Sequence, residues 1–460
     1  MRVRGVALRT MTAPPVRDPG ALPRRIGLWS AVAIVVGSTI GSGIFRTPAS
    51  VADRIPGPLP LLIVWVVAGI FALCGALTLA EVASILPRTG GFYAFLRDGW
   101  SRLPAFLFGW SQLVLVRAIA LGAISITFAE YFLRFLGYDP TVPPYDGIAR
   151  YTAAAAILLT ATFNILGVRW GALVTNLTTL GKFAGLSLVI VIALFLGLPK
   201  TGGHFTPAMP AGSLAFSAFG AALVSVLWAY DGWGDLSYVA GEVQEPQRNL
   251  PRALIGGTLA VMAIYVLANL AYIAVLPVEQ IRTSKLVAAD VAQAVIGRPG
   301  AVIVSLTVMI STFGTLAAVL LTTPRILFAM ADDGLLFKQI AAVHPKYETP
   351  YVAVGLVAAL GATCVLFFPF ERMANAFVTA MIPFYALGVA AVFPLRRRGA
   401  VAAYRTPAYP VVPILFIASV AYLMINGLLD ASTRVDTAII FGIILAGIPF
   451  YYAIERRRRN

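Results

Sequence analysis

The sequence predicts an all-α membrane protein, because apolar stretches of transmembrane length recur along the chain and some are interrupted by glycine. Hydrophobic residues make up 59% of the 460 residues, and charged residues make up only 12%. A soluble globular chain has about 45–50% apolar and about 25% charged residues. One soluble core cannot bury so much apolar surface, so a lipid bilayer is the natural solvent for this chain.

Twelve stretches have the length and composition of a transmembrane helix, which needs about 20 mostly apolar residues. The fourth, ninth and eleventh are close to the minimum length. The predicted spans are 26–55, 60–86, 103–135, 150–166, 171–198, 212–242, 252–276, 300–330, 351–369, 373–395, 411–429 and 436–454.

The positive charges predict the orientation of these spans. The net charge is +15, but the basic residues form short clusters between spans, which argues against a nucleic-acid partner. Of the 35 Lys and Arg residues, 22 fall on the side of the two termini, nine on the opposite side and four within spans. Cytoplasmic loops carry the excess of Lys and Arg, so both termini are expected in the cytoplasm of a cell-membrane protein.

The same reading divides the chain into a single transmembrane domain over 25–455 and cytoplasmic tails over 1–24 and 456–460. The N-terminus lacks the short apolar core and small-residue cleavage site of a signal peptide. Cysteine and histidine are scarce, and both cysteines lie in apolar spans, so neither a disulfide framework, a metal site nor a cofactor is expected.

Hydropathy shows an internal repeat. Spans 1–5 (about 26–198) and spans 6–10 (about 212–395) have similar length, and each set opens with a long helix interrupted by glycine. Because five is an odd number, the second set must run upside down relative to the first. Broken helices at corresponding positions of such inverted repeats indicate a binding site. Spans 11 and 12 (about 411–454) fall outside the repeat.

The first predicted break lies at Gly41-Ser42-Gly43. Gly37 adds a third glycine and Ser38 and Thr39 add hydroxyls within the same seven residues, which makes local unwinding inexpensive. Unwinding would leave free N–H groups at the positive end of the outer half-helix. Such a helix start suits a carboxylate.

The second predicted break lies at Tyr230-Asp231-Gly232. An acidic residue in mid-membrane rarely faces lipid, and freed carbonyls at the end of the first half-helix would accept hydrogen bonds from an ammonium group. A carboxylate site beside an amine site suits an α-amino acid. Glycine patterns of this kind also serve helix packing, but two breaks at matching repeat positions favour a binding site.

Several motifs resemble the amino acid–polyamine–organocation superfamily, and within it the branch of L-type amino acid transporters. The resemblance covers spans 1 to 10 and implies the LeuT-like 5+5 inverted repeat with helices 1 and 6 broken and two extra C-terminal helices. The motifs are Gly41-Ser-Gly-Ile-Phe45, Glu81 to Tyr93, Leu115-Val-Arg117, Trp228-Ala-Tyr-Asp-Gly-Trp233, Gly241 to Pro251 and Thr322-Thr-Pro-Arg325.

The resemblance also implies roles for individual residues around the two breaks. At the first break, Thr39, Ser42 and Gly43 would hold the substrate carboxylate, with Ile40 and Gly41 in the unwound segment. At the second, the carbonyls of Trp228, Ala229 and Asp231 would accept the amine, and Trp228 would form an aromatic outer gate. Tyr230, Gly232 and Trp233 complete this break, and for the two aromatic residues a packing role is an equal alternative.

Lys182 lies about 17 Å into span 5 and is too deep for its ammonium to reach the interface easily. By the resemblance it stands in the place of a sodium ion of sodium-coupled relatives and implies sodium-independent transport. A paired structural lysine is the alternative. Glu81 and Arg117 are expected as gate elements or structural pairs, and Ser311 and Asn375 as pocket-lining or helix-packing residues.

The expected function is therefore sodium-independent transport of small neutral L-amino acids by alternating access, through exchange or proton-coupled uptake. An amine or polyamine carrier would need an acidic cavity, and only Asp231 and Asp235 lie near the break. A channel is the alternative of a different class, and a membrane enzyme is not expected. Animal relatives join a heavy chain through a cysteine between spans 3 and 4. Residues 136–149 contain none, so the chain is expected to work alone as a monomer.

Overall fold

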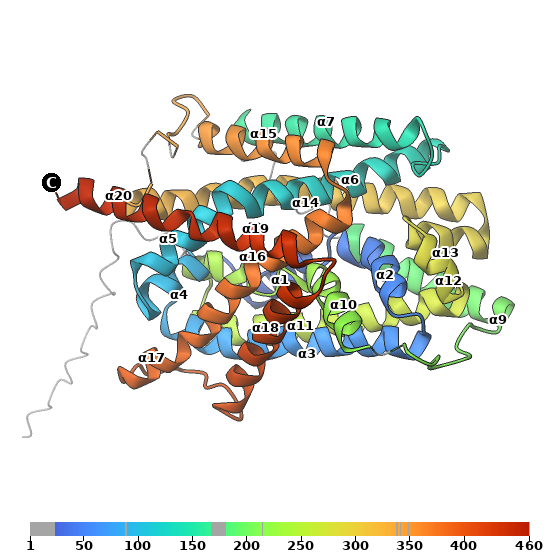
Figure 1. The fold of residues 1–460 in the computed structure, drawn as a ribbon, viewed down its shortest axis with the longest axis horizontal. Helices are drawn as coiled ribbons and strands as arrows, with labels where there is room; N and C mark the ends of the chain where they lie inside the picture. Colours follow the sequence, from blue (N-terminus) through green and yellow to red (C-terminus); the bar gives the residue numbers. More distant parts are fainter. Residues whose placement is uncertain are drawn as a thin grey trace, which may run out of the picture.

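The computed structural model describes residues 24–87, 90–166, 181–213, 215–336, 339–340, 342–347 and 349–459. Within these residues the regular structure is helical, and the only strand-like contact is a bridge between Ile26 and Val243. The helices run mostly along the long axis of the molecule, with α7 (Tyr145–Leu166) and α15 (Tyr351–Phe367) at one edge and α3 (Pro58–Ile85) at the other (Figure 1).

In this part of the chain, nine helices are long and apolar enough to cross a bilayer, and ten if one bent pair counts as a single span. The bent pair coincides with predicted span 1, and the nine others coincide with spans 2–5, 7, 8 and 10–12. Span 5 is described only from Gly181 onward. Predicted spans 6 and 9 coincide with shorter helices of 15 and 17 residues, namely α10 (Phe216–Tyr230) and α15.

The remaining elements are α1 (Leu28–Thr39), α2 (Gly43–Arg54), α4 (Phe92–Gly99), α5 (Arg102–Ser111), the π-helix η1 (Gln112–Val116), α6 (Arg117–Leu136), η2 (Ile192–Gly197), α9 (Leu198–Thr201), the 3₁₀ helix η3 (Asp235–Glu242), α11 (Pro246–Val275), α12 (Val278–Thr283), α13 (Val287–Ile296), α14 (Arg298–Asp332), α16 (Phe370–Ala390), α17 (Val392–Arg397), α18 (Val411–Leu429), α19 (Arg434–Leu445) and α20 (Gly447–Arg459).

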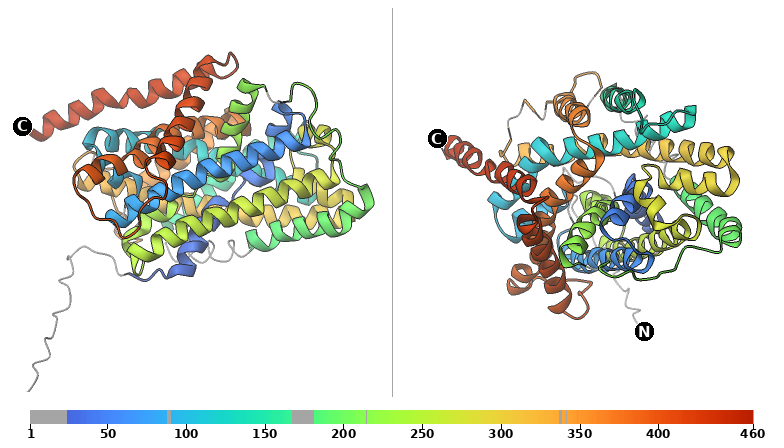
Figure 2. Two further views of the ribbon diagram at one scale, coloured as in Figure 1. Left: turned by 90° about the horizontal axis from the view of Figure 1, so that it is seen from below. Right: turned by 45° about the vertical axis from the view of Figure 1, so that its right-hand side comes forward.

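The helices pack in two groups. α1, α2, α3, α10 and α11 contact one another and are called the bundle here. α6, α7, α14, α15 and α16 also contact one another and are called the frame. α18 and α19 lie against α16, while α20 packs against α5 and carries the C-terminus outward (Figures 1 and 2). The broken helices α1–α2 and α10–η3 both belong to the bundle.

The two ends of the molecule carry different short elements. One end holds α4 and α17 and is called the α4 end, and the other holds α9, α12 and α13 and is called the α13 end (Figure 1). At the α4 end, Glu81 of α3 is almost fully buried and pairs with Arg396 of α17 through two contacts of 2.7 and 2.8 Å. Thr406 donates to the same carboxylate from its backbone N–H and its hydroxyl.

Glu81 therefore joins α3 to the segment that follows α16. The partners of Glu81 are Arg396 and Thr406. Arg117, the other residue that the sequence suggested as a gate element, lies on α6, which belongs to the frame.

Removing the partner of Glu81 is expected to destabilise the fold. In an Arg396→Met variant the buried carboxylate loses its counter-charge, so we expect a loss of about 3 kcal/mol in unfolding free energy. The measurement is the thermal midpoint of the purified protein, followed by size-exclusion chromatography. Arg372→Met is the control, because its pair with Asp436 is about half exposed and contributes at most about 1 kcal/mol. Equal midpoints for the two variants would contradict the assignment.

Candidate functional site

The first break separates α1 from α2 by three residues. α1 ends at Thr39, α2 begins at Gly43, and the two half-helices are bent by 43°. The amide of Ile40 still bonds the carbonyl of Val36, as in a helix. Among the described residues, the amides of Gly41, Ser42 and Gly43 have no backbone acceptor, and no side chain caps α2. The positive end of α2 is thus open to an anionic group.

The two glycines of this break have different surroundings. A Cβ atom added to Gly43 would lie 2.4 Å from the Cα atom of Ala229, so α2 can approach α10 only because residue 43 lacks a side chain. A Cβ atom added to Gly41 would meet nothing within 4 Å. Gly43 is therefore a packing residue between the broken helices, and Gly41 borders open space.

The second break follows Tyr230, the last residue of α10. Asp231 has extended backbone angles, and Gly232 has a φ of +109°, which L-residues with a side chain rarely adopt. A Cβ atom on Gly232 would lie 2.7 Å from the carbonyl carbon of Ser38. The Ser38 hydroxyl lies 3.1 Å from the Gly232 carbonyl, which can accept its hydrogen bond. The ends of α1 and α10 therefore touch at their breaks.

A tyrosine of α11 joins the two breaks. The hydroxyl of Tyr265 lies 2.8 Å from the carbonyl oxygen of Thr39 and 2.9 Å from that of Ala229. Tyr265 is fully buried, and its single proton can serve either carbonyl. Sequence analysis missed this residue. The available signal was the spacing of Tyr265 and Tyr272, which places both hydroxyls on one face of α11, where Tyr272 approaches the Ile44 carbonyl at 3.4 Å.

Lys182 lies beside the first break. Its ammonium nitrogen is 3.2 Å from the Gly37 carbonyl of α1 and 2.6 Å from the Thr315 hydroxyl of α14. The Thr315 hydroxyl donates in turn to the Ser311 carbonyl at 3.0 Å, which leaves a lone pair for Lys182. The ammonium thus links span 5, described from Gly181 onward, to both a broken helix and the frame. Thr315 is a second residue that sequence analysis missed.

Trp228 lies at the end of α10 and packs against the frame. Its ring meets Phe370 and Phe377 of α16 edge to face, with centroid distances of 6.1 and 4.9 Å. Trp228 is mostly buried, and its indole nitrogen has no hydrogen-bond partner in the described part of the chain. The aromatic contacts cover the second break on the side of α16.

Three other predicted residues use their side chains for contacts within their own helix or with neighbouring helices. The Thr39 hydroxyl donates to the Val35 carbonyl of its own helix at 2.7 Å. The Tyr230 hydroxyl donates to the Trp65 carbonyl of α3 at 3.1 Å, and its ring lies against Tyr265. The Trp233 ring packs on aromatic residues of α4, α16 and α18, which are Phe92, Tyr385 and Phe416. The side chains of Tyr230 and Trp233 therefore pack against neighbouring helices. Ile40 is wholly buried.

Asp231 points away from α1. Its carboxylate accepts a hydrogen bond from the Tyr385 hydroxyl of α16. Arg117 is near enough to both Asp231 and Asp235 to interact with them electrostatically. Asp231 and Trp233 line a small, mainly apolar pocket between α3, α10, α16 and α18. The Asp231 side chain is thus committed to the frame, whereas its backbone forms the break.

Of the remaining predicted residues, Asn375 and Ser311 lie on frame helices, and Ser42 lies in the first break. Asn375 of α16 is 3.2 Å from the Ser225 hydroxyl of α10, so it connects the frame to the bundle. The hydroxyls of Ser42 and Ser311 are buried and have no partner within the described residues. An unpartnered Ser42 hydroxyl beside the free amides of α2 is a polar group available to a ligand. The described residues contain no cluster of His, Cys, Asp or Glu that could hold a metal ion.

Two adjoining helix breaks inside a helical membrane bundle are the arrangement expected of a membrane transporter. The chain belongs to the amino acid permease family, whose model matches residues 26–449. This match confirms the resemblance to the superfamily that the motifs indicated.

Curated relatives are similar over nearly the whole chain. It is 32% identical over 448 residues to the serine/threonine exchanger SteT of Bacillus subtilis (strain 168), covering 96% of this chain and 99% of that protein. It is 30% identical over 435 residues to the human b(0,+)-type amino acid transporter 1, covering 94% and 88%. It is 31% identical over 446 residues to the mouse large neutral amino acids transporter small subunit 2, covering 94% and 81%. These relatives support amino acid transport by a permease.

The two glycines of the first break are expected to respond differently to alanine. Gly43→Ala places a methyl group against the Ala229 backbone, so we expect a loss of about 1–3 kcal/mol in stability. Gly41→Ala meets nothing within 4 Å, so we expect a change within about 0.5 kcal/mol. Thermal midpoints without added amino acid test this. A larger loss in Gly41→Ala than in Gly43→Ala would overturn the packing described here.

Removal of the Tyr265 hydroxyl is expected to loosen the contact between the breaks. Tyr265→Phe loses one buried hydrogen bond, so we expect about 1 kcal/mol lower stability together with slower uptake into proteoliposomes. Tyr272→Phe is the matched control, because its hydroxyl makes one longer contact on the same helix face. If uptake is unchanged in Tyr265→Phe, the tyrosine does not connect the breaks during transport.

Proposed function

We propose that this permease carries small neutral L-amino acids without sodium, by alternating access, through exchange or proton-coupled uptake. The observation that carries the proposal is the contact between the two breaks. One break presents the free amides of Gly41, Ser42 and Gly43, and the other ends α10 beside them. A zwitterion would place its carboxylate on the amides of α2 and its ammonium on backbone carbonyls of Trp228, Ala229 and Asp231.

The carbonyls at the end of α10 retain capacity for the ammonium group. Trp228 accepts from the Asp231 amide at 3.3 Å, and Ala229 accepts from Tyr265. Each carbonyl oxygen has a second lone pair. The wholly apolar contacts around Trp228, together with the commitment of Asp231 to Tyr385, favour a neutral amino acid over a polyamine.

Lys182 supports sodium independence. Its ammonium already donates to the Gly37 carbonyl and the Thr315 hydroxyl, which are oxygen ligands of the kind that a sodium ion would use. The Lys182 ammonium is a covalently attached cation, so it supplies beside the first break the positive charge that a sodium ion would otherwise supply. We therefore assign Lys182 the place of a sodium ion, and the link it makes between α1 and the frame is expected to last through the transport cycle.

The twelve predicted spans and the inverted repeat belong to the same proposal. α1–α2 and α10–η3 are both broken, and they open the predicted repeats 26–198 and 212–395. In this scheme the bundle rocks against the frame around the site, while spans 11 and 12 (411–454) stand outside the repeat. Residues 25–455 form one transporter domain between the tails 1–24 and 456–460.

The distribution of Lys and Arg supports a cell-membrane protein with the α4 end in the cytoplasm and the α13 end outside. We further propose that the chain acts as a monomer without a disulfide-linked heavy chain. Its two cysteines, Cys74 and Cys364, are free thiols within membrane-length or apolar helices, and the connection 136–149 has no cysteine.

Uptake by the purified protein in liposomes tests the proposed function. Saturable uptake of a neutral amino acid, chosen by thermal-shift screening of the twenty amino acids, is expected to persist when sodium is replaced by N-methylglucamine. Gly43→Leu is expected to abolish it, because leucine would overlap Ala229. The matched control is Gly256→Leu on α11, where an added Cβ meets nothing within 4 Å. Strict sodium dependence would contradict the role of Lys182, and single-channel currents would instead indicate a channel.

A further inference from the structure

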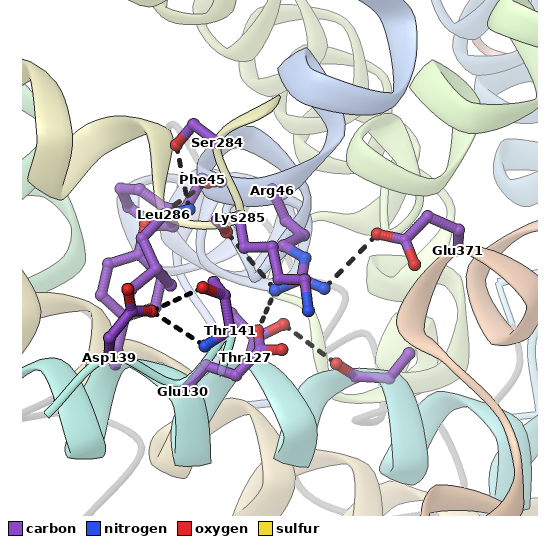
Figure 3. A network of polar contacts seen from close by, with 12 residues as sticks. Phe45, Arg46, Thr127, Glu130, Asp139, Thr141, Ser284, Lys285, Leu286 and Glu371 are labelled. Carbon is purple, nitrogen blue, oxygen red and sulfur yellow. Dashed lines mark hydrogen bonds and ion pairs between the residues drawn. The ribbon is translucent and has the colours of Figure 1, made fainter. Parts of the chain in front are cut away.

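A buried arginine connects the half-helix α2 to the frame at the α13 end (Figure 3). Arg46 is 3% exposed, and its guanidinium pairs with the carboxylate of Glu130 on α6. The same guanidinium lies 3.4 Å from Glu371 Oε1 at the start of α16 and 3.4 Å from the Lys285 carbonyl between α12 and α13. Because α2 begins at the free amides of the first break, Arg46 ties the site itself to two frame helices.

The ion pair is built into the interior of the protein. The Glu130 side chain is 6% exposed, and that of Glu371 is 48% exposed. A guanidinium removed from water needs its counter-charges, because a buried charge without a partner loses its hydration and gains nothing in return. The docked position of α2 therefore depends on Glu130 and Glu371, which both belong to the frame.

The ion pair continues into the aromatic contacts that cover the second break. The guanidinium carbon of Arg46 lies 4.9 Å from the centre of the Phe370 ring, and Phe370 meets Trp228 edge to face. One residue before Arg46, the Phe45 carbonyl accepts a hydrogen bond from the buried Tyr131 hydroxyl of α6 at 3.3 Å. A continuous set of contacts thus runs from the charges at the α13 end to Trp228.

We infer that Arg46, Glu130 and Glu371 form an ionic latch that closes the substrate pathway at the α13 end. The inference rests on the proposed alternating access, in which the bundle moves against the frame. Both partners of Arg46 lie on the frame, so the latch breaks when α2 tilts away and forms again when α2 docks. Arg46 is a positioning residue in this scheme, because it acts on substrate through the position of α2.

A reporter cysteine at the contact between α10 and α16 tests the inference. Ser225 lies on α10 within one turn of Trp228 and is buried beside Asn375 of α16. Ser225→Cys is introduced into a chain that lacks Cys74 and Cys364, and the protein is placed in lipid nanodiscs without amino acid. The measurement is the rate of labelling by a positively charged methanethiosulfonate. Arg46→Gln and Glu130→Gln are each expected to raise this rate roughly tenfold, because they release α2.

Two further variants separate a latch from a general loss of packing. Arg46→Lys keeps the positive charge between Glu130 and Glu371, so it is expected to label close to the parent rate. Arg372→Gln is the matched control, because it breaks a 2.7 Å pair with Asp436 between two helices outside the bundle. Its labelling rate is expected to equal that of the parent.

The inference is overturned if a folded Arg46→Gln protein labels at the parent rate, or if Arg372→Gln raises the rate equally. If Arg46→Gln does not fold, Glu130→Gln decides, because it removes the buried partner while the half-exposed Glu371 remains as a counter-charge for Arg46. A rise then supports the latch, and the parent rate overturns it. The labelling needs no substrate, so absence of amino-acid uptake would contradict the proposed function alone.

Discussion

The close crossing of the two broken helices is the contact on which the site depends. Gly43 lies against the Ala229 backbone, Gly232 lies against Ser38, and no side chain separates either pair. Free amides of α2 and the carbonyl end of α10 therefore border the same space. Side chains at either glycine would push the half-helices apart, and Gly232 also requires a left-handed backbone. The Tyr265 hydroxyl lies within hydrogen-bond distance of the carbonyl oxygens of both Thr39 and Ala229, so it joins the ends of α1 and α10.

Buried charges in this protein connect elements that the chain keeps far apart. Lys182 joins a broken helix to α14, Glu81 joins α3 to α17, and Arg46 joins α2 to α6 and α16. A charge in a medium of low dielectric constant needs a counter-charge or hydrogen-bond partners, so each of these groups holds the helices that it joins in one relative position. Under the proposed alternating access, the pairs of Glu81 and Arg46 at the two ends of the bundle would limit the relative movement of the helices.

Both helix breaks were predictable from the sequence. The unwound segments at Ile40–Ser42 and at Asp231 coincide with the predicted breaks, because clustered glycines and an acidic residue weaken a helix wherever it packs. The directions of the side chains were not predictable. Tyr230 and Trp233 flank the break in sequence, yet their side chains pack on α3 and on α16. A direction of this kind depends on which helices surround the break.

Composition, hydropathy and glycine positions were sufficient for the membrane class, the approximate spans and the two breaks, since each of these properties is local to a short segment. They could not reveal Tyr265, Thr315 or the partners of Arg46. These residues act on atoms of other helices that lie from 36 to 325 positions away in the chain, and a threonine or arginine in an apolar stretch carries no local mark of its partner. Their contacts depend on how distant helices pack together, because a buried polar group must form its hydrogen bonds within the folded protein.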